Sequence, residues 1–149
     1  MTRTAISRAT LSDLDVVKAL LEREHLPLAG LEDHFDHAFV ARAGGRVVGC
    51  AALELYADGA LLRSVAVAAE HRGAGIGADL TREAIRAAGE RRVPAVYLLT
   101  TTAEHFFPRF GFEVVDRADV PPGVRSSAEF SYACPSDAIV MRTFLTSTT

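Results

Sequence analysis

The sequence is poor in cysteine and carries no strong excess of charge of either sign. Its two cysteines, Cys50 and Cys134, lie far apart and form no Cys-x-x-Cys arrangement. This usage fits a reducing compartment better than a disulfide-stabilised secreted scaffold. The 16 Lys and Arg residues against 19 Asp and Glu residues give a net charge of -3. That imbalance is too small to predict a nucleic-acid-binding surface, so an anionic ligand would need a local site.

Long apolar runs are also missing. No segment approaches the roughly 18 apolar residues of a membrane span, and the residues from Met1 to Ala5 contain no apolar signal core. We therefore expect a cytoplasmic protein with no membrane partner. The 149 residues, 49% hydrophobic and 23% charged, are typical of one globular domain over residues 1–149, and no repeat or linker divides them.

The spacing of apolar residues predicts an α/β (α+β) domain, with a mixed sheet and helices on its faces. Strands at 38–43, 46–56 and 60–67, separated by glycine-containing turns, form an antiparallel meander. A helix from Ile76 to about Glu90 then connects the last of these strands to a parallel strand. The other expected elements are strands at 5–8, 93–101, 112–116 and 138–144, and helices from the N-cap Ser12 to about 24, at 103–110 and at 124–132.

A glycine cluster lies between the third meander strand and the helix that begins at Ile76. Residues 71–78 read HRGAGIGA, and glycines let backbone N–H groups approach a ligand without obstruction by side chains. The positive end of the helix dipole favours a phosphate group, and Arg72 adds a charge nearby. The cluster predicts a phosphate site, with a glycine-rich helix start that binds nothing as the alternative.

Two other classes of phosphate-binding loop fit this cluster less well. A P-loop requires Gly-Lys-Ser/Thr, but Ala78-Asp79 follows Gly77. Residues 73–78 do match the Gly-x-Gly-x-x-Gly/Ala pattern of dinucleotide-binding folds. However, the strand at 60–67 ends several residues before the first glycine of this pattern. The next strand ends in Thr100-Thr101-Thr102 and lacks the acidic residue that binds ribose in such folds. A nicotinamide-dependent oxidoreductase is therefore the weaker alternative.

Two motifs resemble those of the GNAT N-acetyltransferases. Arg72, Gly75 and Gly77 match the acetyl-CoA pattern Arg/Gln-x-x-Gly-x-Gly/Ala. Residues 103–112, which read AEHFFPRFGF, are similar to the second family motif, Ala-x-x-Phe-Tyr-x-x-x-Gly-Phe. The resemblance implies a GNAT-like mixed central sheet, flanked by helices and splayed apart between the strands that end near residues 67 and 101.

The same resemblance implies that acetyl-CoA is the acyl donor and that its pantetheine arm lies in the opening of the sheet. The implied contacts are the backbone of Val65, Ala66 and Val67 for pantetheine, the amides of Arg72, Gly73, Ala74, Gly75, Ile76, Gly77 and Ala78 for the pyrophosphate, and Phe106, Phe107 and Arg109 at the border of the channel.

Three further segments are similar to a narrower group, the ArsN-type branch found with arsenic-resistance genes. They are 61–67 (LLRSVAV), 97–102 (YLLTTT) and 130–136 (FSYACPS). This similarity implies a small amino-acid-like acceptor, including arsenical or phosphinic amino-acid toxins. Homodimers are common in the wider family, so a homodimer is a further expectation.

Direct transfer to a neutral primary amine is the simplest chemistry for such a site. A strand N–H near Val67 would stabilise the charge that develops on the carbonyl oxygen. Glu54 is the expected base, with a solvated, outward-facing glutamate as the alternative. Arg63 is expected to bind a carboxylate of the substrate, with a surface or hairpin ion pair as the alternative.

Phe107 stands where the resembling family has the tyrosine that protonates the leaving thiolate. The identity of the acid is therefore open, and a noncatalytic acyl-CoA-binding sensor becomes a second hypothesis for function. The candidates for the acid are Tyr97, Thr101, His105 and water.

The remaining clusters predict no other chemistry. Residues 33–37, DHFDH, offer two imidazoles and two carboxylates, but a polar helix surface explains them better than metal ligation, so no metal is expected. Cys50 lies in an apolar strand and is expected in the core. Cys134 could react or bind trivalent arsenic, although a buried small thiol is the commoner role.

Overall fold

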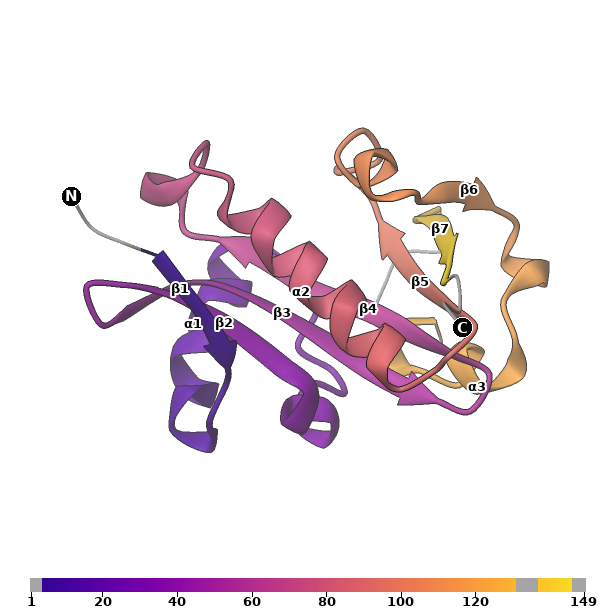
Figure 1. The fold of residues 1–149 in the computed structure, drawn as a ribbon, viewed down its shortest axis with the longest axis horizontal. Helices are drawn as coiled ribbons and strands as arrows, with labels where there is room; N and C mark the ends of the chain where they lie inside the picture. Colours follow the sequence, from indigo (N-terminus) through magenta and orange to yellow (C-terminus); the bar gives the residue numbers. More distant parts are fainter. Residues whose placement is uncertain (1–3, 131–136, 146–149) are drawn as a thin grey trace.

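The computed structural model describes residues 4–130 and 137–145 and contains, over those residues, one seven-stranded sheet in the order β1-β2-β3-β4-β5-β7-β6 (Figure 1). The β4–β5 pair is parallel and the others are antiparallel, so the predicted mixed α/β sheet is confirmed. The elements are β1 (Thr4–Arg8), η1 (Leu11–Asp13), α1 (Leu14–Arg23), η2 (Glu32–His37), β2 (Ala38–Ala43), β3 (Arg46–Tyr56), β4 (Gly59–Val67), η3 (Ala69–His71), α2 (Ile76–Glu90), β5 (Ala95–Thr100), η4 (Phe107–Phe110), β6 (Glu113–Val115), η5 (Arg117–Asp119), α3 (Pro122–Arg125) and β7 (Ile139–Phe144).

The two long helices cover opposite faces of the sheet. On β2, Phe39 packs in one core cluster with Leu80 of α2, and the neighbouring Val40 packs in another with Leu21 of α1. Successive side chains of a strand point to opposite faces, which explains how one strand serves both clusters. Within the described residues, no helix has the length and apolar character needed to cross a membrane.

The expectation that Ser12 caps the first helix is wrong. A 3-10 turn, η1, precedes α1, and the Oδ2 atom of Asp13 accepts the N–H of Thr10 at 2.8 Å. Oδ2 of Asp13 also accepts from Nη2 of Arg42 on β2 at 2.7 Å. Burial raises the pKa of Asp13, but the bonds from Thr10 and Arg42 outweigh it and lower that pKa overall. The Asp13 carboxylate thus closes the capping box of η1 with Thr10 and ties this turn to the sheet through Arg42.

Two expected short helices are also reduced. Residues 103–110 form only the 3-10 turn η4, closed by Gly111 with a φ of 91°. Pro108 has no N–H and cannot continue an α-helical hydrogen-bond pattern through this segment. The helix expected at 124–132 is divided: α3 covers Pro122–Arg125, residues 128–130 are helical again, and the last residues of the range lie outside the described part of the chain.

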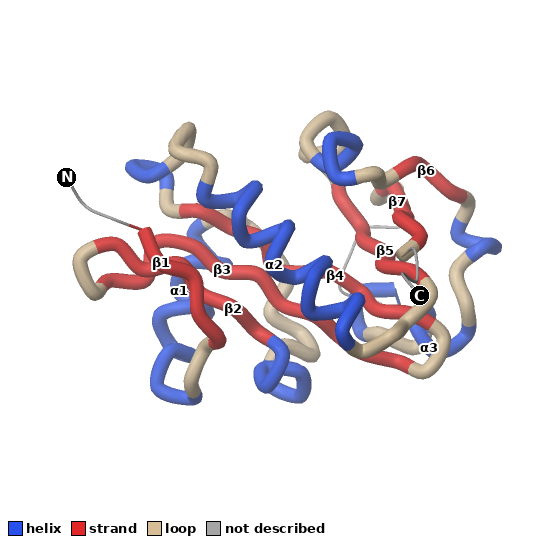
Figure 2. Tube along the Cα trace, in the orientation of Figure 1, coloured by secondary structure: helices blue, strands red, loops and turns tan. Residues whose placement is uncertain are grey.

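The sheet opens between β4 and β5. These strands are paired only at Ala60 with Val96 and at Leu61 with Tyr97. In Figure 2 they lie close at their first residues and diverge towards their ends. On its other edge, β4 has a bulge, because the pairing passes from Ala52–Arg63 to Cys50–Ala66. Ser64 lies in this bulge with a φ of 60°, which breaks the regular pattern of strand hydrogen bonds.

Candidate active site

A cavity of about 1360 Å³ occupies the opening between β4 and β5. Its walls come from the bulged part of β4, the glycine loop with the start of α2, the end of β5, the segment before η4, and the loop after α1. Elements distant in the sequence thus meet at one site. The predicted residues that line it are Arg63, Val65, Ala66, Val67, Arg72, Gly73, Gly75, Ile76, Gly77, Ala78, Phe106, Phe107 and Arg109, whereas Glu54 and Ala74 do not line it.

The glycine loop presents its backbone to this cavity. Gly73 and Gly75 have φ values of 87° and 81°, and a Cβ atom added at either position would meet no atom within 4 Å. Gly75 is the N-cap of α2, so the amide N–H groups of the first turn have no partner within the helix. An open cradle of amides at the positive end of a 15-residue helix fits the diphosphate of CoA.

Two arginines flank this cradle. The guanidinium of Arg72 pairs with Glu24 at the end of α1, and its Nε lies 3.4 Å from the carbonyl oxygen of Val67. Arg109 lies with its guanidinium 4.8 Å from the centre of the Phe106 ring. Both arginines are exposed, so each can reorient towards a phosphate group at little cost in desolvation.

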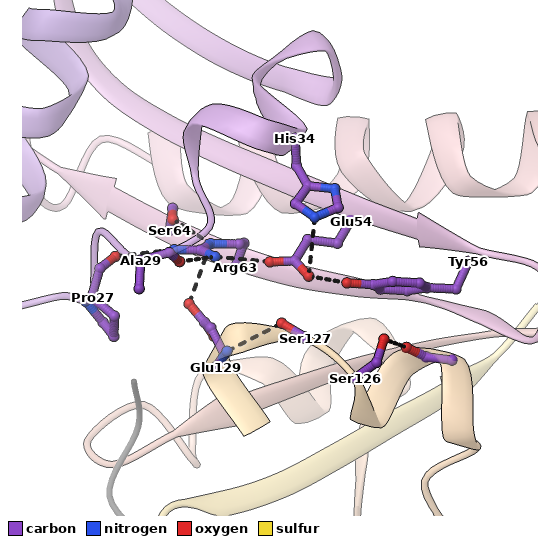
Figure 3. Close-up of polar contacts among 11 residues, drawn as sticks. Pro27, Ala29, His34, Glu54, Tyr56, Arg63, Ser64, Ser126, Ser127 and Glu129 are labelled. Atoms are coloured by element: carbon purple, nitrogen blue, oxygen red, sulfur yellow. Dashed lines mark hydrogen bonds and ion pairs between the residues drawn. The ribbon is translucent and has the colours of Figure 1, made fainter. Parts of the chain in front are cut away.

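The Arg63 guanidinium is buried in the cavity wall and contacts four elements of the chain (Figure 3). Nη1 donates to Oε2 of Glu54 at 2.8 Å, and Nε lies 3.3 Å from Oε2 of Glu129. Nε also donates to Oγ of Ser64 at 3.1 Å. The carbonyl oxygens of Pro27 and Ala29 accept from Nη2 and Nη1 at 3.2 and 2.6 Å. Arg63 therefore forms a buried ion pair with Glu54 across the β3–β4 hairpin, which the hairpin alternative anticipated, and the pair is not on the surface.

Glu54 lies behind Arg63 and is 1% exposed, so it is not a solvated, outward-facing residue. The Tyr56 hydroxyl donates to its Oε1 atom, and Nε2 of His34 lies 3.6 Å from the same atom. Burial raises the pKa of Glu54, but hydrogen bonds from Tyr56, Arg63 and Ser127 outweigh burial and lower that pKa overall. Glu54 is therefore held as a carboxylate by its neighbours.

The candidates for the acid differ in position. Thr101 and His105 line the cavity. Tyr97 is buried on the other side of β5, in a core cluster with Val120 and Val124. Phe107 lines the cavity and packs against Phe106, with ring centroids 5.0 Å apart.

Among the described residues, the remaining candidates are a buried thiol and a histidine beside Glu54. Cys50 is buried, as expected, and burial raises the pKa of its thiol to about 12, so it is no nucleophile at neutral pH. Cys134 lies outside the described residues. Within the described part of the chain, no three His, Cys, Asp or Glu residues are grouped to hold a metal. His34 instead faces Glu54.

Sequence reasoning missed the part of the site contributed by the loop after α1 and by Glu129. His25, Leu26 and Pro27 line the cavity, and Glu129 lies in its wall. One signal was available: an arginine within the apolar strand 60–67 requires buried acceptors from elsewhere in the chain. The sequence gives no indication of which acceptors these are.

Comparisons with known proteins agree with this geometry. The model of the acetyltransferase (GNAT) domain family matches residues 34–114. The chain is 31% identical over 126 residues to the uncharacterized N-acetyltransferase CT2212 of Chlorobaculum tepidum, covering 79% of this chain and 81% of that protein. It is 31% identical over 153 aligned positions to an amino-acid acetyltransferase of Mycobacterium tuberculosis, covering 96% of this chain and 84% of that protein.

Solved structures share the fold. Rv2747 from Mycobacterium tuberculosis, in a complex that contains CoA, has a TM-score of 0.82 at 28% identity, over 95% of this chain and 99% of that one. N-acetylglutamate synthase from Neisseria gonorrhoeae, complexed with coenzyme A and N-acetyl-glutamate, has a TM-score of 0.83 at 22% identity. The match covers 99% of this chain but only 36% of the synthase, so it shows a shared fold.

The open sheet and the amide cradle at α2, together with the family match, define an acetyltransferase fold. The chain belongs to the GNAT family of acetyltransferases. It is an enzyme, and acetyl-CoA is its acyl donor.

Proposed function

We propose that this enzyme transfers an acetyl group from acetyl-CoA to the primary amine of a small amino acid. The observation that carries the proposal is the buried Arg63 guanidinium in the wall of the cavity, beside the bulge of β4. A fixed buried cation is a partner for a carboxylate, which amino acids carry next to their amine. The relative in Mycobacterium tuberculosis that is named an amino-acid acetyltransferase supports the same substrate class.

Acetyl-CoA supplies the acetyl group as an activated thioester. The amides from Arg72 to Ala78 would hold its diphosphate, with Arg72 as a charge partner. Beyond Leu61, the edge of β4 that faces β5 is not paired with that strand. This edge, which includes Val65, Ala66 and Val67, would pair with the amide groups of pantetheine as a strand pairs with a sheet edge. Phe106, Phe107 and Arg109 would border the channel.

The bulge of β4 would place the reacting carbonyl. Ser64, with its positive φ, interrupts the β3–β4 pairing, so backbone N–H groups between residues 64 and 67 are redirected. An N–H at this point would stabilise the negative charge that develops on the carbonyl oxygen as the amine attacks. Thr101, His105 or water would then protonate the leaving sulfur, since Thr101 and His105 line the cavity.

Arg63 would bind the carboxylate of the acceptor. A guanidinium has five N–H donors. The contacts to Ser64, Glu54, Ala29 and Pro27 use the Nε donor, both Nη1 donors and one Nη2 donor. The second Nη2 donor, for which no contact is seen among the described residues, would be the one that donates to the substrate carboxylate. Glu54 anchors the guanidinium from behind, and its expected role as the base stays a prediction.

A CoA-release assay tests this function. We would incubate the enzyme with acetyl-CoA and each of the common amino acids, polyamines, aminoglycosides, and arsenical and phosphinic analogues of amino acids, and confirm products by mass spectrometry. We expect turnover with amino acids or their analogues and none with polyamines. Tight CoA binding without turnover on any amine would instead support the acyl-CoA-binding sensor. The link to arsenic resistance, a cytoplasmic location and a homodimer stay predictions.

A further inference from the structure

Two carboxylates contact the Arg63 guanidinium, and only one of them also lines the cavity. Glu129, in the segment after α3, is 4% exposed and lies in the cavity wall. Glu54, on β3, contacts the same guanidinium but does not line the cavity. Figure 3 shows the two side chains reaching Arg63 from different elements. The acceptor in the cavity therefore meets Glu129, not Glu54.

We infer that Glu129 binds the ammonium group of the acceptor amino acid and removes its proton. This inference rests on the proposed function and extends it by a catalytic residue. Glu129 and Arg63 together would bind the two charges of a zwitterion, one pairing with the ammonium and the other with the carboxylate.

The contacts of Glu54 suit a positioning residue. It pairs with Arg63 at 2.8 Å and accepts the Tyr56 hydroxyl, and His34 lies 3.6 Å away. These partners favour its charged form and hold its pKa below the usual value, despite its burial. A carboxylate with these contacts, which does not itself line the cavity, would meet an acceptor there only through Arg63 or a bridging water. It fixes Arg63 instead.

The contacts of Glu129 suit a ligand for the ammonium group. Its Oε2 atom lies 3.3 Å from Nε of Arg63, so one cation and one anion stand close together in the cavity wall. The carboxylate and ammonium of an amino acid are similarly close, because they are attached to the same carbon atom. A zwitterion can therefore find a partner for each charge in a buried site, where an unpaired charge is strongly disfavoured.

The reaction balances with Glu129 as the proton acceptor. Its carboxylate takes one proton from the ammonium group and leaves a neutral amine with a free electron pair. The nitrogen forms a bond to the acetyl carbon, the carbon–sulfur bond breaks, and its electron pair leaves on sulfur. A second proton passes from nitrogen to sulfur, and Glu129 releases its own proton to solvent. The products are an amide, the CoA thiol and one proton.

The titratable groups near Glu129 come from several elements. Arg63 of β4 contacts it directly, and Glu54 of β3 lies across the guanidinium. His25, at the end of α1, faces the same cavity, as do His71 and His105 from its other walls. The pH experiment therefore compares variants at one position and with one acceptor, so that the contributions of these histidines are common to all curves.

The kinetic test uses Glu129→Gln, which keeps the size of the side chain and an oxygen acceptor for Arg63. At pH 7 we expect kcat/KM to fall by roughly 10²–10⁴, the contribution of a general base. The ratio of wild-type to variant kcat/KM should fall about tenfold for each pH unit up to the pKa of the amine. The variant can use only acceptor molecules whose amine is already deprotonated in solution. Glu54→Gln should keep the wild-type shape of the profile at a lower rate. Glu113→Gln, on the exposed edge strand β6, is the matched control and should be unchanged.

A binding test needs no turnover. Titration calorimetry would compare the acceptor ranked first in the CoA-release assay with the acid that lacks its amine, such as L-glutamate with glutarate. We expect the wild type and Glu54→Gln to prefer the amino acid at least tenfold at pH 7. Glu129→Gln should lose that preference while it binds CoA as the wild type does. If Glu129→Gln fails to fold, Glu129→Asp should keep the wild-type pH profile at a reduced rate.

The outcomes separate the two proposals. Absence of turnover by the wild type with every amine overturns the proposed function, and this inference with it. Wild-type turnover together with an unchanged pH profile or an unchanged preference in Glu129→Gln overturns the inference alone. Two other results would assign the base elsewhere. One is that Glu54→Gln shows the pH dependence expected of Glu129→Gln, and the other is that Glu129→Asp shows it.

Discussion

Nη1 of Arg63 lies 2.8 Å from Oε2 of Glu54, and neither side chain is more than 1% exposed. The pair joins adjacent strands, β4 and β3, and its Arg63 member lines the cavity. Removal of Arg63 leaves Glu54 buried without its cation, whereas removal of Glu54 leaves Arg63 paired with Glu129. Part of the stability and the proposed substrate site would therefore depend on the same residue, Arg63.

Arg63→Ala should lower the free energy of unfolding by about 3–5 kcal/mol, because it leaves Glu54 buried without its cation. Urea denaturation measures this loss. Lys18→Ala, which removes the exposed pair with Glu32, should change stability by under about 1 kcal/mol. Where the Arg63 variant still folds, its KM for the acceptor should rise much more than its KM for acetyl-CoA. Equal increases in both would contradict a carboxylate site at Arg63.

Phe107→Tyr should be tolerated, because Phe107 borders the cavity and a hydroxyl can point into it. The variant should bind CoA and gain a group that can protonate the thiolate, which would change the alkaline limb of the rate profile. Phe112→Tyr is the control: Phe112 packs in the same aromatic cluster but does not line the cavity. Its buried hydroxyl should lower the free energy of unfolding by about 1–3 kcal/mol. Loss of CoA binding in Phe107→Tyr would argue against the proposed position of the thioester.

Gly75→Ala should weaken CoA binding and destabilise the fold by about 1–2 kcal/mol, because alanine at a φ of 81° is strained. Gly77 has no positive φ, and a Cβ there would lie 3.6 Å from its nearest neighbours, Phe106 and Val67. Gly77 lies in α2, so Gly77→Ala should keep or slightly raise the free energy of unfolding, by at most about 1 kcal/mol. Thermal denaturation and CoA titration of both variants would measure these effects. Equal stability of the two would show that the backbone at Gly75 relaxes.

The lowered pKa values of Asp13 and Glu54 predict a loss of stability in acid. Both carboxyls have lower pKa values in the folded chain than their ordinary values of 3.8 and 4.5. They therefore stabilise the fold fully above those values, and the contribution is lost as the pH falls through the lower, folded pKa. Urea denaturation between pH 7 and 3 should show a shallower decline in Glu54→Gln than in the wild type. Parallel curves would mean that Glu54 has the same pKa in both states.

Local patterns in the sequence predicted much of the fold. The bounds of β2 and β3 agree with the expected 38–43 and 46–56, because β-prone runs are separated there by glycine turns. The glycine loop was also predictable, since Gly73 and Gly75 adopt the positive φ that glycine permits. Ser12 was misleading because its competitor, Asp13, is fixed by Arg42 from a distant strand.

The acceptor side was harder to predict because it depends on contacts between distant segments. Alternation along a strand cannot show whether Glu54 faces solvent when both faces of β3 are covered. Glu129 and Pro27 meet Arg63 only after folding, and neither belongs to a motif with its own chemistry. The glycine loop followed from local spacing, whereas the surroundings of Arg63 are built by tertiary contacts.

The short pairing between β4 and β5 leaves main-chain groups without a strand partner in the middle of the sheet. Acetyl-CoA whose pantetheine amides pair with β4 would take the place of a missing strand. It would bridge the parts of the sheet that lie on the β4 side and on the β5 side of the opening. Binding of acetyl-CoA would then make the sheet more rigid. Release of CoA after the reaction would make the same sheet more flexible before the next acetyl-CoA molecule binds.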